Sequence, residues 1–325
     1  MKVLVTGGAG YIGSHTVSAL LKMNYQVVVV DNLSTGFRES IPTAAEFELG
    51  DIKDTQFLVN LIKKHKITSI IHFAAKLIVP ESVVKPIEYY ENNTTGVLSV
   101  VRACELTGVQ QIVFSSTAAV YGDANSEIQF VDENSKVAPL NPYGWSKYMS
   151  EQIIKDCEKS FGLKSVILRY FNVAGAAVDG SNGQKTKNAT HLIKVASEVA
   201  VGKKEQISIF GTDYPTQDGT GVRDYIHVED LAELHILALK YLADGNKSDI
   251  FNCGYGQGYS VKQVIHAVEK VSEKKLKCIL CPRREGDASS LIANCKKIKD
   301  KFNWKPKNND IEVICKSAYQ WELKQ

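Results

Sequence analysis

The chain has 325 residues, of which 44% are hydrophobic, and its formal net charge is +3. This length allows one large core or two domains, and the interleaved acidic and basic residues argue against a nucleic-acid-binding surface. No signal peptide precedes the first predicted strand, and no apolar run reaches the roughly 18 residues that a membrane span needs, so we expect a soluble, cytoplasmic protein without a membrane partner.

The seven cysteines are scattered and odd in number, as expected of reduced thiols in a cytosolic protein. Cys278 and Cys281 form a single C-x-x-C. In an extended segment their side chains would point to opposite faces, and the sequence offers no second pair of ligands, so we expect no metal site.

The first predicted strand, Lys2–Thr6, runs directly into the sequence GGAGYIG, and an amphipathic helix follows to about Met23. Glycines at positions 7, 10 and 13 suit a tight turn from strand to helix and a close approach of the backbone to a pyrophosphate. They also allow the helix to pack closely on the sheet. The sequence therefore predicts a dinucleotide-binding turn.

The next predicted strand, Gln26–Val30, ends at Asp31. Asp31 stands close to the distance from the glycine-rich turn at which an acid binds the adenosine ribose hydroxyls. A carboxylate here would repel a 2′-phosphate, so we predict NAD as the cofactor. Asp51, after the predicted strand Glu46–Leu49, could cap a local turn or contact the adenine, and the sequence leaves both open.

Strands and helices continue to alternate through the first half of the chain. This alternation predicts an α/β fold with a doubly wound parallel sheet of the Rossmann type. The further elements are a helix over Thr55–Lys64, a strand over Ser69–Phe73, a helix from about Pro86 to Leu106 and a strand over Val109–Ser115.

Hydroxyl side chains stand at the end of the last of these strands, in the sequence SSTAAVYG. Open α/β sheets bind ligands at this edge. Tyr143 and Lys147 follow at the i, i+4 spacing that places two side chains on one helix face, where the ammonium would lower the pKa of the phenol. An ordinary helix pair has the same spacing, but its place after Ser115, Ser116 and Thr117 favours a proton-transfer site.

The second half of the chain contains a smaller set of predicted elements. We predict two domains: an NAD-binding Rossmann domain over 1–173 plus 222–254, and a mixed α/β substrate domain over 174–221 plus 255–325. The elements are strands over Lys164–Tyr170, Gln206–Phe210 and Val222–His227, helices over Asn188–Gly202 and Leu231–Leu242, and a turn-rich loop over Tyr214–Gly221.

Several motifs resemble those of the extended short-chain dehydrogenase/reductase family. They are GGAGYIG with Asp31, HFAA, SSTAAVYG, the Tyr143–Lys147 pair and RYFNVAG. The later motifs DYPTQDGTGVRDYIHVEDLA and PRREGD resemble the UDP-galactose (UDP-glucose) 4-epimerases of that family. The resemblance extends to the C-terminus. It implies an NAD-dependent isomerase of nucleotide sugars in galactose metabolism, and a homodimer packed through helices around 90–106 and 143–160.

By this resemblance Tyr143 is the catalytic base, Lys147 tunes it and holds the nicotinamide ribose, and Thr117 takes the family's serine/threonine role. The chain departs from the family at Leu77, where a lysine is frequent, and whether the adjacent Lys76 reaches the cofactor stays open. The implied cofactor-binding residues are Gly7, Gly10, Tyr11, Ile12, Gly13, Asp31, Asn32, Asp51, Ile52, Phe73, Ala74, Asn92, Ser115, Tyr143, Lys147 and Tyr170.

The resemblance also implies a site for a UDP-sugar. Arg223 and Arg284 would grip the pyrophosphate, a task that suits guanidinium groups, and Asp287 would accept the uridine ribose hydroxyls. Without the resemblance, both arginines could be surface ion pairs with their acidic neighbours, and His191 could be a packed histidine. The implied substrate-binding residues are Thr117, Asn172, His191, Leu192, Ser208, Phe210, Arg223, Arg284, Asp287 and Leu291.

Leu291 bears on the choice of sugar. Some epimerases of this family place a tyrosine at this position, where it closes the sugar pocket. Leucine is smaller and has no hydroxyl, so the pocket would have room for an N-acetyl group. Leu291 could also be a packing residue and nothing more.

Epimerisation at carbon 4 inverts a centre that carries no acidic proton, so direct deprotonation is unreasonable. The resemblance implies transient oxidation by NAD to a 4-keto sugar, rotation of the sugar about its link to the diphosphate, and re-reduction. The expected substrates are UDP-galactose and UDP-glucose, with the N-acetylhexosamine pair as a possible addition.

Three other kinds of protein would share this fold. A 4,6-dehydratase is disfavoured because Ala118 and Ala119 stand where the dehydratases carry an Asp-Glu pair. A carbon-4 epimerase of UDP-glucuronate or a UDP-pentose would share the same machinery and stays open. A protein that only senses NAD or serves as a scaffold would have no need of Thr117, Tyr143 and Lys147 together.

Overall fold

The computed structural model describes the chain except for residues 124–129, 187–188 and 285–286. Contacts divide the chain into two compact units. The first unit comprises residues 1–120, 139–169 and 232–251, and the second comprises 121–138, 170–231 and 252–325.

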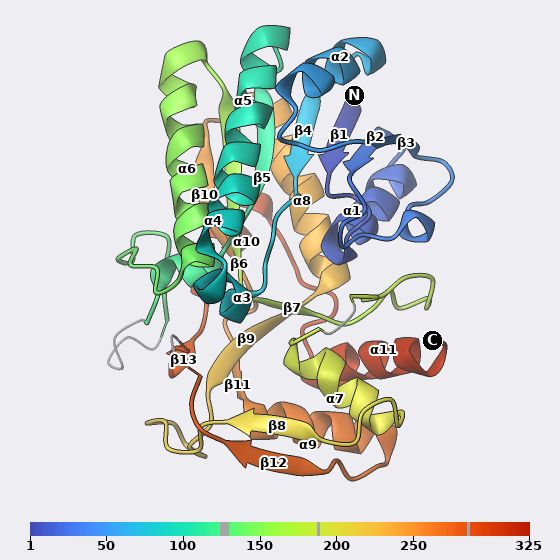
Figure 1. Cartoon of the computed structure of the whole chain (residues 1–325), viewed down its shortest axis with the longest axis vertical. Coiled ribbons are helices and arrows are strands. Elements are labelled where there is room, and N and C mark those ends of the chain that lie inside the picture. Colours follow the sequence, from blue (N-terminus) through green and yellow to red (C-terminus); the bar gives the residue numbers. More distant parts are fainter. Residues whose placement is uncertain (124–129, 187–188, 285–286) are drawn as a thin grey trace. The chain divides into compact units, whose positions relative to one another are not determined.

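The first unit is built on a seven-stranded sheet with the strand order β10-β6-β5-β4-β1-β2-β3 (Figure 1). The pairs of β1 with β2 and β4, of β2 with β3 and of β4 with β5 are parallel. This sheet confirms the predicted α/β fold of the Rossmann type. The strands are β1 (Lys2–Thr6), β2 (Gln26–Asp31), β3 (Glu46–Leu49), β4 (Ser69–His72), β5 (Gln111–Thr117), β6 (Lys164–Tyr170) and β10 (Asp249–Cys253).

Helices cover both faces of this sheet. Successive residues of a strand point to opposite faces, and Ser115 of β5 contacts His235 of α8 while Ser116 contacts Glu151 of α6. Helices α6 and α8 therefore lie on opposite faces. The helices are α1 (Tyr11–Lys22), α2 (Thr55–His65), α3 (Val79–Val84), α4 (Pro86–Tyr89), α5 (Gly96–Thr107), α6 (Pro142–Phe161) and α8 (Val228–Ala243), with short 3-10 turns η1 (Arg38–Ser40) and η3 (Ala118–Tyr121).

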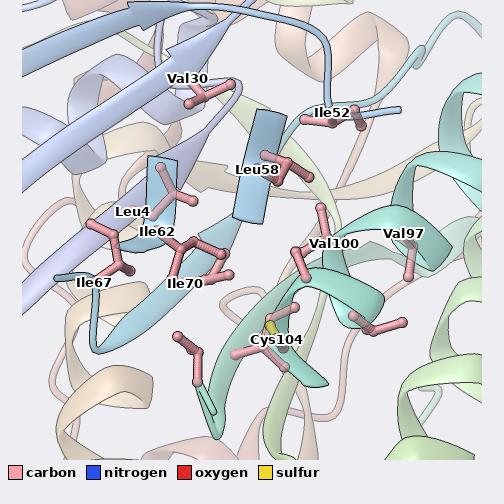
Figure 2. Packing of buried hydrophobic residues seen from close by; sticks show 14 of the residues in the cluster. Leu4, Val30, Ile52, Leu58, Ile62, Ile67, Ile70, Val97, Val100 and Cys104 are labelled. Carbon is pink, nitrogen blue, oxygen red and sulfur yellow. The ribbon is translucent and has the colours of Figure 1, made fainter. Parts of the chain in front are cut away.

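The core of the first unit lies between the sheet and helices α2 and α5 (Figure 2). Leu4 and Ile70 come from the central strands, Leu58 from α2, and Val100 and Cys104 from α5, and all are buried. The strands β1, β2 and β4 have apolar residues in succession rather than in alternation, because both of their faces are covered.

The long helix predicted from about Pro86 to Leu106 is interrupted by a π-helical turn, η2 (Tyr90–Thr95). The reason lies in Asn93, which is buried in this turn. Its side chain accepts a hydrogen bond from the backbone N–H of Lys76 (2.8 Å) and donates to the Lys76 carbonyl and to Ser146 Oγ (3.0 Å each). The wider turn therefore points an amide inward, where it joins the loop after β4 to α6.

The second unit contains two smaller sheets. Strand β9 (Val222–His227) pairs with β7 (Asn172–Ala174) and β13 (Ser290–Leu291) in parallel and with β11 (Gly258–Ser260) in antiparallel fashion. Strand β8 (Ile207–Phe210) pairs in parallel with β12 (Cys278–Cys281). The helices of this unit are α7 (Leu192–Ala200), α9 (Val261–Ser272), α10 (Lys296–Phe302) and α11 (Ile311–Leu323).

The two units differ from the predicted domains at four places. Strand β9 and residues 228–231 group with the second unit, because the strand partners of β9 all lie there. Residues 121–138 also group with the second unit, where Val131 forms a bridge with Ala293. The boundary residues 170–173 and 252–254 follow them.

Helix α7 begins at Leu192 rather than near position 188, because His191 has an extended backbone and serves as its N-cap. Asn188 lies outside the described residues. Within the described part of the chain, no helix is long and apolar enough to cross a membrane.

The turn after β1 yields a prediction about stability. A Cβ atom on Gly7 would lie 2.6 Å from the backbone nitrogen of Ala74, whereas one on Gly108 would meet nothing within 4 Å. Both residues have similar positive φ angles, +72° and +76°, so Gly108→Ala is a matched control for the backbone strain alone. We expect Gly7→Ala to lose about 1–3 kcal/mol more free energy of unfolding than Gly108→Ala in urea titrations. Equal losses would contradict the close packing described here.

Candidate active site

The turn between β1 and α1 is held by backbone hydrogen bonds. The N–H of Gly7 donates to Val30 O (2.8 Å) and the N–H of Gly10 to Gly7 O (3.1 Å). A Cβ on Gly13 would lie 2.3 Å from Gly7 O, so the helix can approach the turn this closely only with glycine there. The first turn of α1, all of it described, has no acidic side chain, and its N-cap is Gly10. The positive end of the helix is therefore available to an anion, which fits a pyrophosphate.

Asp31 lies beside this turn at the end of β2 and is 8% exposed. Its Oδ2 accepts a hydrogen bond from Ala9 N (3.0 Å) and its Oδ1 from Leu33 N (2.9 Å). Burial raises the pKa of this carboxyl, and the two backbone hydrogen bonds oppose that rise. The carboxylate is thus fixed at the same sheet edge as the glycine turn.

Asp51 stands at the end of the neighbouring strand β3. Its Oδ1 accepts from Lys53 N (2.9 Å), and its Oδ2 accepts from Asn32 Nδ2 (3.4 Å). The first contact is the local cap that the sequence allowed. The second joins two of the residues that the sequence assigns to the cofactor.

Most of the remaining predicted cofactor residues of the first unit lie at or just after the carboxyl ends of its parallel strands. These ends meet at one edge of the sheet. Ala74 packs over Gly7, and the ring of Phe73 lies 4.6 Å from that of His235. Tyr170 belongs to the second unit. Tyr11 and Ile12 begin α1, Ile52 follows β3, Asn92 lies in η2, and Ser115 lies in β5.

Both the side chain and the backbone of Lys76 have partners within the first unit. Its ammonium forms an ion pair with Glu88, and its backbone is bound to Asn93. Leu77, at the position where a lysine is frequent in the family, is 47% exposed.

The predicted proton-transfer residues come together at the end of β5. Lys147 of α6 is buried, and its Nζ donates to the backbone carbonyl of Ser115 (2.9 Å). Tyr143, one turn earlier, is 8% exposed, and the side chain of Thr117 lies close enough to its phenol to lower the pKa. The hydroxyl, the phenol and the lysine therefore converge within one unit, as the sequence predicts.

The start of α6 fixes the position of Tyr143. The side chain of Asn141 caps the helix by accepting from Gly144 N (2.9 Å), and Pro142 is the first helical residue. A Cβ on Gly144 would lie 2.8 Å from Ala119 O, so this glycine lets the helix approach the segment after Thr117. The helix cap and the close approach of α6 to this segment together fix Tyr143 beside Thr117.

The electrostatics of the pair follow from burial. Burial raises the pKa of Tyr143, and the hydrogen bond with Thr117 opposes that rise. Burial lowers the pKa of Lys147 to about 7, and the nearby charge of Glu151 acts in the opposite direction. Burial therefore keeps the phenol of Tyr143 protonated near neutral pH, against the lowered pKa that its spacing from Lys147 predicts, whereas it brings the pKa of Lys147 close to neutral. A lysine that changes protonation in this range suits general acid–base chemistry.

Three residues that hold this site were missed from the sequence. His235 shares a hydrogen bond with Ser115 Oγ (2.9 Å), and Asn93 bonds Ser146 Oγ next to Lys147. Glu151 accepts from Ser116 Oγ (2.5 Å). Glu151 could have been found, because it follows Lys147 at the same spacing that joins Lys147 to Tyr143. His235 is brought in by the sheet topology alone.

In the second unit, Arg284 and Arg223 have different partners. The guanidinium of Arg284 lies 3.6 Å from the ring centroid of Phe210. Arg223 donates from Nη1 to Val222 O (2.8 Å) and from Nη2 to Ala288 O (2.7 Å). The alternative of a surface ion pair between Arg223 and Asp224 is wrong, because Asp224 is fully buried and accepts from backbone N–H groups such as that of Gly256.

Leu291 is 9% exposed and stands opposite Arg223 in the parallel register of β13 and β9. His191 is half-buried, its Nδ1 is bonded to Gln184 Nε2 (2.8 Å), and burial lowers its pKa. The other predicted substrate residues of this unit are Asn172 in β7, Leu192 at the start of α7, Ser208 and Phe210 in β8, and Asp287 before β13.

Among the described residues, no group of three or more His, Cys, Asp or Glu side chains could hold a metal ion. Cys278 and Cys281 begin and end β12 as free thiols.

Residues 3–254 match the model of the NAD dependent epimerase/dehydratase family. The chain is 48% identical over 321 residues to the UDP-glucose 4-epimerase of Azospirillum brasilense, covering 99% of this chain and 92% of that protein. It is 38% identical to the UDP-glucose 4-epimerase from Brucella ovis in complex with NAD (TM-score 0.94, 99% and 98% covered). It is 47% identical to the UDP-Glc/GlcNAc 4-epimerase from Campylobacter jejuni (TM-score 0.86, 100% and 99% covered). The chain therefore belongs to the NAD dependent epimerase/dehydratase family.

Proposed function

We propose that the chain interconverts UDP-galactose and UDP-glucose by inverting carbon 4, with NAD as a bound cofactor. The observation that carries this function is the meeting of Thr117, Tyr143 and Lys147 at the end of β5, in the unit that also holds the glycine turn. Two relatives that the chain matches over nearly their whole length are named UDP-glucose 4-epimerases.

The first unit fits the cofactor. The pyrophosphate would bind the N-terminus of α1, where the glycines leave room, and Asp31 would accept the adenosine ribose hydroxyls. Lys147 would hold the nicotinamide ribose. When bound, NAD would supply a hydride acceptor for the oxidation of carbon 4 and a hydride donor for its re-reduction.

Tyr143 performs the proton transfer in this proposal. As a phenolate it takes the proton of the 4-hydroxyl, which leaves a ketone at carbon 4, and it gives the proton back after the sugar has turned. The side chain of Thr117 lies beside the phenol and would orient it by a hydrogen bond. The positive charge of Lys147 favours the phenolate, because an opposite charge nearby stabilises the ionised form.

The second unit would bind the UDP. Arg284 is stacked on Phe210, which fixes the orientation of its planar guanidinium for binding a phosphate oxygen. Arg223 is fixed by hydrogen bonds to two backbone carbonyls. Asp287 would accept the uridine ribose hydroxyls. Strong contacts to the nucleotide leave the sugar free to rotate, so binding energy far from carbon 4 serves the reaction.

We further propose a homodimer formed through α5 and α6. Leu98 on α5 and Trp145 and Met149 on α6 are 47%, 40% and 41% exposed. Large apolar side chains exposed on neighbouring helices are typical of a surface that another chain covers. The cytoplasmic location stays a prediction of the sequence.

The first test offers UDP-galactose, UDP-N-acetylgalactosamine, UDP-glucuronate and UDP-xylose separately, without added cofactor, and follows each by NMR. We expect the first two to be converted to their 4-epimers, and denatured protein to release NAD. Conversion of only the glucuronate or the pentose would replace the proposed substrate. Turnover that consumes fresh cofactor in proportion to product would contradict a bound NAD.

Tyr143→Phe removes only the proton acceptor. We expect it to keep NAD and UDP and to lose about 100- to 10,000-fold in kcat, since general acid–base groups contribute about that much. Thr117→Val should cost less, because this hydroxyl orients the phenol and does not accept the net proton. A Tyr143→Phe protein within a few-fold of the parent would show that another group is the base.

Leu291→Tyr tests the choice of sugar. We expect the parent to epimerise both UDP-galactose and UDP-N-acetylgalactosamine, and Leu291→Tyr to lose roughly 5- to 150-fold in kcat/KM for the N-acetyl sugar alone, because filling a packed site costs about 1–3 kcal/mol. Leu280→Tyr is the matched control, because Leu280 is 69% exposed in the same unit. An unchanged ratio of kcat/KM in Leu291→Tyr would make Leu291 a packing residue.

A further inference from the structure

A buried ion pair lies next to the proposed catalytic lysine. Glu151 of α6 is fully buried and Arg169 of β6 is 2% exposed. Arg169 donates from Nε to Glu151 Oε1 (2.9 Å) and from Nη2 to Oε2 (2.6 Å). Burying two charges costs several kcal/mol, and apolar residues of similar size often serve stability as well. The pair therefore calls for a reason other than stability.

Glu151 is joined to the end of β5 in the same way as Lys147. Ser116 Oγ donates to Glu151 Oε1 (2.5 Å), and Lys147 Nζ donates to the carbonyl of Ser115 (2.9 Å). Residues on two successive turns of α6 thus form hydrogen bonds with two successive residues of β5. The next residue of the strand is Thr117, whose side chain lies beside that of Tyr143, one turn earlier on the helix than Lys147.

The charged surroundings of Lys147 give Glu151 a second effect. Lys147 is buried, which disfavours its ammonium form, and the charge of Glu151 favours that form. On the strand side, His72 of β4 is buried, and burial together with the charge of Lys147 lowers its pKa to about 3, so it is neutral. The other titratable groups that face this region are Arg169 of β6, His235 of α8, and Tyr89 of α4 with its partner Glu81.

We propose that Glu151, held by Arg169 and Ser116, is a positioning residue that keeps Lys147 as an ammonium ion beside Tyr143. Its carboxylate supplies the compensating charge, and its two partners fix that charge in place from the neighbouring strands β6 and β5. The consequence for turnover rests on the proposed function. The effect on the charge of Lys147 does not.

The chain offers a matched control for Glu151→Gln. Glu158 lies on the same helix and accepts from Ser165 Oγ (2.5 Å) on β6, the strand that carries Arg169. Glu158→Gln therefore removes the same charge and a serine hydrogen bond like that of Ser116 with Glu151, two helical turns away from Glu151. It leaves the contacts of Lys147 untouched.

The titration of Lys147 is measured by ¹³C NMR on protein labelled at lysine Cε, with the Lys147 signal assigned by its loss in Lys147→Met. We expect the midpoint to fall by about 1 pH unit or more in Glu151→Gln, because a charge partner is lost. It should stay unchanged in Glu158→Gln. Glu151→Asp keeps the charge and should keep the midpoint near that of the parent.

The activity readout is the dependence of kcat on pH. Loss of the ammonium removes the charge that favours the Tyr143 phenolate, so the alkaline limb should move to lower pH in Glu151→Gln by about the same amount as the NMR midpoint. KM for UDP-galactose should change little, because Glu151 is not among the proposed UDP contacts. A merely structural role would lower activity without displacing the limb.

Removal of Glu151 alone leaves Arg169 buried without its partner and can prevent folding. The double variant Glu151→Gln, Arg169→Gln removes both charges and should show the same downward direction. An unchanged Lys147 midpoint in either folded variant overturns the proposal. So does a failure of every Glu151 variant to fold, Glu151→Asp included, because the pair would then serve stability alone. If Glu151→Gln displaces the Lys147 midpoint but the parent protein epimerises no UDP-sugar, the role of Glu151 is supported and the proposed function is rejected.

Discussion

The contact between α6 and the end of β5 is the interaction on which the rest of the site depends. Lys147 Nζ donates to the carbonyl of Ser115 at 2.9 Å, and the Tyr143 phenol lies beside the Thr117 side chain. Both contacts require the helix to lie close to the strand, which Gly144 permits and the Asn141 cap fixes. A parallel sheet delivers β5 to that point, because its strands all end at the same edge. Backbone geometry therefore positions the proposed acid–base group.

Much of this arrangement could be predicted from local patterns. Consecutive apolar residues mark strands covered on both faces, so β1, β2 and β4 are visible in the sequence. The glycine turn and the spacing of Tyr143 and Lys147 are equally local. What could not be predicted depends on distant partners: the π turn at Asn93 exists for Lys76 and Ser146, and β9 belongs to the second unit because its strand partners are there. Arg169 gave no local signal, because its partner Glu151 lies on another element.

The two units divide the proposed work. In the first unit, backbone groups fix a side chain that we propose binds NAD: the carboxylate of Asp31 accepts hydrogen bonds from the N–H groups of Ala9 and Leu33. In the second unit, neighbouring groups orient the arginines that we propose bind UDP. The ring of Phe210, for example, orients the guanidinium of Arg284. This separation suits a reaction in which the nucleotide must stay while the sugar turns, because the contacts that retain UDP are not the contacts that move protons.

The central claim is that the hydrogen on carbon 4 leaves the sugar and returns to it without passing into water. The most direct measurement uses UDP-galactose that carries deuterium at carbon 4, incubated in ordinary water and analysed by NMR and mass spectrometry. The account predicts UDP-glucose that retains the deuterium at carbon 4. A product that carries solvent hydrogen at carbon 4 would contradict it, because inversion would then proceed by proton exchange and not by the transfer for which Tyr143, Lys147 and the glycine turn are arranged.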